Sequence, residues 1–119
     1  MRVDRAHPRA CLPAPEGLYS YIIFSFCLSE SNHEIKKLLS PHSTIPIRSG
    51  IHITLDPGRV GLVLSRESLA SSGVFVADSP HLINSNHELI VLLHNGNDDA
   101  RYIEHGVPIA TLIFLPYRL

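Results

Sequence analysis

The chain has 119 residues, which is enough for one domain with a hydrophobic core and too few for two. Charged residues make up 18% of the sequence and apolar residues 45%, a balance typical of a folded soluble domain. The formal net charge of -1 leaves no electrostatic footprint for nucleic acid or for an anionic membrane surface. Composition therefore predicts a single globular unit with no nucleic-acid partner.

Targeting and membrane signals are weak along the N-terminal part of the chain. The apolar stretch at residues 21–28 is interrupted by Ser25 and is far shorter than the ~20 residues that span a bilayer. Prolines interrupt residues 1–16 where a signal peptide would need a continuous apolar segment. We expect an intracellular protein without a membrane span, in which Cys11 and Cys27 stay reduced.

Residues 1–16 contain three prolines, three arginines and no periodic apolar pattern. This composition predicts a flexible or loosely docked arm, followed by one β domain over residues 17–119. Residues 18–28 are aromatic and β-branched in character, which favours a buried strand. Ser31 and Glu34 have capping-box spacing ahead of Ile35, which predicts a short helix that ends before Pro41.

From residue 45 onwards, short apolar runs alternate with turn signals. Ile51, Ile53 and Leu55 show the period-2 pattern of a strand with one buried face. The sequences Asp56-Pro57-Gly58 and Asn95-Gly96 are typical of turns. Further strands are predicted at residues 60–64, 74–77, 89–93 and 109–115. This spacing predicts an all-β sandwich or barrel.

Common catalytic and metal-binding motifs do not stand out. The spacing of His81, His87 and His94 matches no metal-ligand motif, so we predict no metal site. Ser65 and Ser68 lack the Gly-x-Ser-x-Gly context of an activated nucleophile, and are interpreted as turn and strand-edge serines. Phosphate-binding loops of the Walker type are also missing from the sequence.

Several separated blocks of the sequence, spread over residues 43–116, nevertheless resemble consecutive segments of trimeric dUTPases. The blocks fall at residues 43–53, 56–62, 65–74, 88–95 and 106–114. The resemblance implies a dUTPase-like jelly roll, or distorted β-barrel. It also implies that part of the region around residues 31–39 is extended.

The resemblance implies the chemistry of this family, in which an activated water hydrolyses dUTP to dUMP and pyrophosphate while Mg²⁺ neutralises the triphosphate. Motifs from more than one subunit build each site. Arg66 and Ser68 keep the form of the phosphate-binding loop and are predicted to be its relic. Glu67 stands where the family has a phosphate-binding serine, and a carboxylate there would repel the substrate.

Other family positions differ more strongly. Counting back from Glu88 places Leu82 at the water-activating aspartate and Ser85 at the tyrosine beneath uracil. Thr111 replaces a glutamine, and the first motif and the glycine-rich C-terminal arm have no counterpart. We therefore expect a protein that is not an enzyme, with no catalytic residues and no cofactor. Mg²⁺ is expected only if the chain is an active dUTPase.

A dUTPase-like protein without an active site is similar in kind to the first open-reading-frame products of adenovirus early region 4, which bind host proteins. The ending Tyr117-Arg118-Leu119 suits a class of PDZ ligands, although Leu119 could equally end a strand. The leading hypothesis is therefore an inactive viral protein in the host cytoplasm or nucleus that binds host scaffold proteins, some with PDZ domains. A homotrimer is expected first and a monomer second.

Two other hypotheses stay open. One is an enzyme: either a divergent dUTP diphosphatase that recruits replacement groups such as Asp78 and His87, or a subunit that needs a partner chain. The other is a regulatory protein that binds nucleotides through Arg66 without hydrolysing them.

Overall fold

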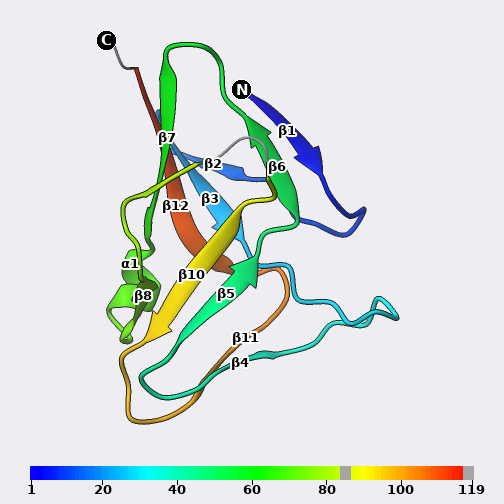
Figure 1. Ribbon diagram of the computed structural model, residues 1–119, viewed down its shortest axis with the longest axis vertical. Helices are drawn as coiled ribbons and strands as arrows, with labels where there is room; N and C mark the ends of the chain where they lie inside the picture. The colour runs from blue at the N-terminus through cyan, green and yellow to red at the C-terminus, as the bar shows by residue number, and fades with distance from the viewer. Residues whose placement is uncertain (84–86, 117–119) are drawn as a thin grey trace.

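The computed structural model describes residues 1–83 and 87–116. The elements, in chain order, are β1 (Arg2–Arg5), β2 (Ala14–Glu16), β3 (Ser20–Phe24), β4 (Lys37–Leu39), β5 (Thr44–Arg48), β6 (Ile51–Thr54), β7 (Arg59–Ser65), α1 (Glu67–Ala70), β8 (Val74–Val76), β9 (His81–Leu82), β10 (Ile90–Asn95), β11 (Arg101–Ile103) and β12 (Pro108–Pro116). Figure 1 shows these strands around a common core, with one short helical turn, α1, at the left side beside β8. The predicted all-β architecture is confirmed.

Strand β12 is the central strand of the larger sheet. It is the longest strand, with 9 residues, and it pairs antiparallel with β3 on one side and β7 on the other. The sheet has five strands in the order β2-β3-β12-β7-β9. A second sheet has the order β5-β10-β8, and two pairs, β1-β6 and β4-β11, complete the fold.

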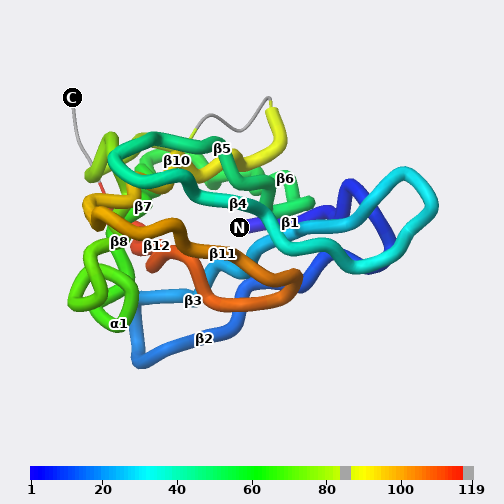
Figure 2. The backbone as a smooth tube through the Cα atoms, turned by 90° about the horizontal axis from the view of Figure 1, so that it is seen from below, coloured from blue at the N-terminus to red at the C-terminus, as the bar shows by residue number. Residues whose placement is uncertain are grey.

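The core lies between these sheets. Ile23, Val63 and Leu112 point inward from the five-stranded sheet, and Ile47 and Leu93 from the three-stranded one, with exposed fractions of 0–1%. Figure 2 shows β5 and β10 on one side of the molecule and β2 and β3 on the other. Because side chains alternate along a strand, the opposite faces stay open to carry polar groups.

The N-terminal residues are better ordered than the sequence predicts. Strand β1 pairs with β6 over its full length, and β2 pairs with β3 at the edge of the larger sheet. Ala10 is buried, with an exposed fraction of 4%. Two prolines lie between the strands and Pro15 sits in an edge strand, where a missing N–H is tolerated. The predicted flexible arm is thus replaced by paired strands.

The predicted helix after Ser31 does not form. Asn32 has a φ of 63°, and Glu34 forms an isolated antiparallel bridge with Leu28. The chain then continues into β4, which pairs with β11. Long-range pairing outweighs a capping signal that precedes too few residues for a stable helix. Among the described residues the one α-helix is α1, a single turn at residues 67–70 that the sequence did not predict.

No helix within the described ranges is both long enough and apolar enough to cross a membrane. Cys27 is buried and Cys11 is partly buried, and both are free thiols.

Candidate functional site

A cleft of about 420 Å³ lies where β7 ends beside β12 and the end of β2. Strand β7 pairs with β12, which places Leu64 opposite Thr111, and Arg66 follows directly after the end of β7. The residues that line the cleft are Glu16, Leu64, Ser65, Arg66, Glu67 and Thr111. The cleft is therefore built from segments that lie far apart in the sequence.

Arg66 is held on the wall of this cleft by two contacts. Its Nη1 donates a hydrogen bond to Glu16 Oε1 at 2.7 Å and another to Thr111 Oγ1 at 3.3 Å. Its Nε is buried and has no hydrogen-bond partner among the described residues. The side chain is 17% exposed, so the guanidinium is largely fixed yet still reaches the cleft. A guanidinium held in this way suits phosphate or carboxylate oxygens.

The two residues predicted as a relic phosphate loop are placed differently. Arg66 lines the cleft, whereas Ser68 is exposed within α1 and does not line it. Glu67 lines the cleft from the first turn of α1. The partner of Arg66, Glu16, escaped the sequence analysis, because nothing in the sequence links residues that lie 50 positions apart.

A second cleft, of about 300 Å³, holds a carboxylate–imidazole pair. His81 Nδ1 lies 2.8 Å from Asp78 Oδ2, three residues earlier in the chain, and both side chains are partly exposed. When Nδ1–H donates to the carboxylate, Nε2 is left with a lone pair that can accept a proton. This is the arrangement of a general base with its orienting group. His87 lines the same cleft.

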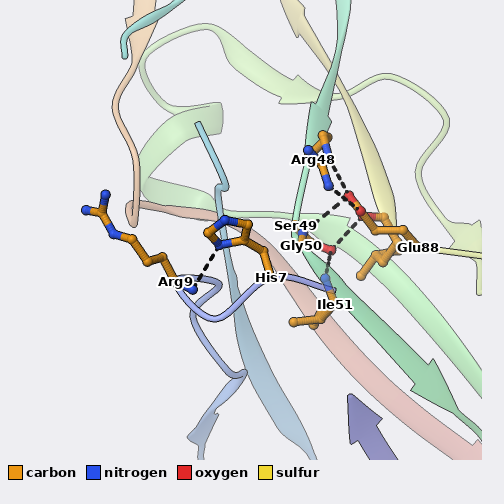
Figure 3. A network of polar contacts seen from close by, with 8 residues as sticks. His7, Arg9, Arg48, Ser49, Gly50, Ile51 and Glu88 are labelled. Atoms are coloured by element: carbon orange, nitrogen blue, oxygen red, sulfur yellow. Dashed lines mark hydrogen bonds and ion pairs between the residues drawn. The ribbon is translucent and has the colours of Figure 1, made fainter. Parts of the chain in front are cut away.

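The other carboxylate of this cleft, Glu88, is already engaged. Arg48 donates to it through Nε at 3.0 Å and Nη2 at 2.8 Å, and the Gly50 N–H lies 3.3 Å from Oε2 (Figure 3). The hydrogen bond from Arg48 to Glu88 raises the pKa of that guanidinium. Glu88 therefore ties β5 to the start of β10 and leaves Asp78 and His81 as the pair available for chemistry.

The remaining sequence-predicted positions are distributed as follows. Leu82 lies in β9 opposite Leu62 and is 60% exposed. Ser85, Tyr117, Arg118 and Leu119 fall outside the described residues. In residues 1–83 and 87–116, no group of three or more His, Cys, Asp or Glu side chains is arranged to hold a metal ion.

Comparison with known proteins shows relationships to dUTP-hydrolysing enzymes. No family model matches the chain. The deoxyuridine 5'-triphosphate nucleotidohydrolase of Tropheryma whipplei strain Twist is 29% identical over 83 residues, and the same enzyme of strain TW08/27 matches equally. The match takes in 66% of this chain but only 57% of that enzyme's length.

Solved structures with this fold are also dUTPases. The Streptococcus mutans dUTPase superposes with a TM-score of 0.80 at 16% identity, covering 98% of this chain and 96% of its own. A mutant dUTPase of Staphylococcus aureus phage phi11, which coordinates a structural Mg(II) ion, has a TM-score of 0.80 at 17% identity, with 99% and 91% covered. The predicted dUTPase-like all-β fold is therefore confirmed.

These comparisons overturn the leading functional prediction. The sequence led us to expect a protein that is not an enzyme and that binds host proteins for a virus. That prediction is wrong, because the curated relatives are nucleotidohydrolases and the structures that share the fold are dUTPases. The similarity to adenoviral early proteins and the PDZ interpretation find no support among them. The placement of Leu82 and Ser85 at catalytic positions stays a prediction.

Proposed function

We propose that the protein is a divergent dUTP diphosphatase that hydrolyses dUTP to dUMP and pyrophosphate. The observation that carries the proposal is the position of Arg66, the residue that matches the phosphate loop of dUTPases, on the wall of a cleft. The sequence match to nucleotidohydrolases supports the same reaction.

In this proposal Arg66 binds phosphate oxygens of the substrate. Its guanidinium carries the positive charge that attracts phosphate oxygens, and its hydrogen bond to Thr111 orients it before the substrate arrives. Negative charge shifts toward the departing pyrophosphate in the transition state, so a fixed cation there lowers the barrier.

The cleft also fits the magnesium ion that dUTP hydrolysis implies. Mg²⁺ prefers carboxylate oxygens and is usually held by one or two carboxylates together with substrate phosphates. Glu67 lines the cleft next to Arg66 and is exposed, so its carboxylate would hold the ion. Bound Mg²⁺ supplies positive charge that offsets the repulsion between Glu67 and the triphosphate.

His81 is the proposed general base. Its Nε2 accepts a proton from the attacking water, while Asp78 stabilises the imidazolium that forms. The water oxygen then bonds to the α-phosphorus, and the bond from that phosphorus to the bridging oxygen breaks. Pyrophosphate leaves with the electron pair. This assignment keeps Asp78 from the earlier hypothesis and adds His81 as the group that meets the water.

The two clefts are lined by separate sets of residues. We therefore propose that the active site forms between copies of the chain, with Arg66 from one copy and His81 from another, in a homotrimer.

The direct test is pyrophosphate release by the purified chain with dUTP and Mg²⁺. Turnover above buffer is expected, together with its loss in Arg66→Ala. Binding of dUTP without turnover would contradict the proposal and favour a nucleotide-binding protein.

A further inference from the structure

We infer that Glu16 is an anion latch on the phosphate cleft: its carboxylate occupies Arg66 and must be displaced before a phosphate can bind there. The inference rests on the proposed function, in which Arg66 receives the phosphates of the substrate. It adds a residue that controls how strongly the site binds them.

The contact itself has the chemistry of a bound anion. Glu16 Oε1 lies 2.7 Å from Arg66 Nη1, the distance of a charge-assisted hydrogen bond. The carboxylate uses this one donor and makes no two-pronged contact, while Nε has no partner among the described residues. A single contact of this kind is weaker than the bidentate binding that a guanidinium can offer. Glu16 therefore occupies Arg66 through a single hydrogen bond, which a phosphate that binds in bidentate fashion can displace.

The segment that carries Glu16 is lightly anchored. Strand β2 has three residues, lies at the edge of its sheet and pairs with β3. The turn that follows contains Gly17 with a φ of 77°, and then Leu18 and Tyr19, which are 90% and 75% exposed. The Glu16 backbone stays paired with Ser20, whose Oγ also donates to the Glu16 carbonyl, but the Glu16 side chain is 45% exposed and can rotate away from Arg66 into solvent.

The net charge of the cleft lining explains how Glu16 weakens the binding of anions. The cleft holds one cation, Arg66, and two carboxylates, Glu16 and Glu67, so its charged lining sums to +1 − 2 = −1. Without Glu16 the sum becomes 0, and Arg66 loses its competitor for phosphate oxygens. The latch thus weakens the binding of simple anions, including the pyrophosphate that the reaction releases.

The test is calorimetric titration of inorganic pyrophosphate into the full chain without Mg²⁺. Glu16→Gln keeps the size of the side chain but removes its charge, and should bind pyrophosphate about fivefold more tightly than wild type. Glu67→Gln is the matched control, because it removes the same charge from the same cleft without touching Arg66. Its gain should be smaller. In Glu16→Gln/Arg66→Gln the gain should disappear.

Unchanged or weaker binding by Glu16→Gln overturns the latch, as does an equal gain in Glu67→Gln. Thermal unfolding checks that each variant is folded. Assaying dUTP turnover on the same proteins separates the two proposals. If the chain hydrolyses dUTP but Glu16→Gln gains no affinity for pyrophosphate, only the latch proposal is refuted. If Glu16→Gln gains affinity but the chain never hydrolyses dUTP, only the proposed enzymatic function is refuted.

Discussion

At the scale of single residues, Arg66 should be judged by its geometry as well as its charge. Arg66→Ala removes the cation from the cleft and should lower kcat/KM for dUTP by about 100-fold. Arg66→Lys keeps the charge but cannot reproduce the planar fork, so it should recover only part of that loss. Steady-state assays of both variants check this. Equal activity in Arg66→Ala and wild type would remove Arg66 from the site.

The pair formed by Asp78 and His81 gives a second prediction. Asp78→Asn should lower kcat by about 100-fold, because an amide neither fixes the imidazole as a carboxylate does nor stabilises its charged form. His81→Ala should fall to a similar level, and the double variant should lose little more. Single-turnover rates check this. His87→Ala is the control in the same cleft, and a larger loss there would move the role of base to His87.

Cys27 gives a prediction on stability. Burial raises the pKa of its thiol above the usual 9.0, against the lowering by the nearby charge of Lys37. Above pH 9 the unfolded chain therefore ionises first, so the free energy of unfolding should fall as pH rises further. Denaturant unfolding between neutral and alkaline pH should show a flatter profile in Cys27→Ala. An identical slope in the two proteins would contradict the assignment.

At the scale of elements, the turn after β10 depends on one buried amide. Asn95 is fully buried, and its Nδ2 donates to the carbonyls of Leu39 and Asp99, both at 3.0 Å. Its Oδ1 accepts from the backbone N–H of Asn97 at 3.0 Å. Asn95→Ala leaves these groups unpaired and should cost about 2–3 kcal/mol of stability, measured by denaturant unfolding. Asn97→Ala, at a half-buried position, should cost less.

Elements with strong local signals could be predicted from the sequence. The alternation of Ile51 and Ile53 fixed which face of β6 is buried, and Gly58 takes the positive φ, 79°, that its turn requires. β1 could not be predicted, because its polar residues gain order only from pairing with β6, some 50 positions away. The failed helix near Asn32 has the same origin, since contacts across the fold outweigh local preference.

The residues of the candidate site also divide into those with a local sequence signal and those whose role depends on contacts across the fold. Arg66 could be found because a local motif surrounds it, and Asp78 because it lies close to a family position. Asp78 and His81 lie three residues apart, and this short spacing could have indicated their pairing. The signal was missed because His81 was considered only as a metal ligand. Glu16 could not be found, because its contact with Arg66 forms only when the fold brings the end of β2 within reach of the residue that follows β7.

At the scale of the whole molecule, the Arg66 cleft and the His81 cleft share no lining residue, and the proposed active site takes Arg66 and His81 from two different copies of the chain. Co-expression of differently tagged Arg66→Ala and His81→Ala chains tests this, because each chain carries the group that the other lacks. In a trimer that mixes the two variants, one of the three subunit boundaries brings an intact Arg66 together with an intact His81. Mixed oligomers should then recover about a third of the wild-type activity.

Each variant expressed alone is the control and should keep only about one hundredth of the wild-type activity. Purification through both tags ensures that only mixed oligomers are assayed, and light scattering gives their size. Mixed oligomers that remain inactive would place both groups in one copy or remove one of them from the reaction. Recovery instead requires that the chain closes its active site across a subunit boundary, since neither chain holds both groups.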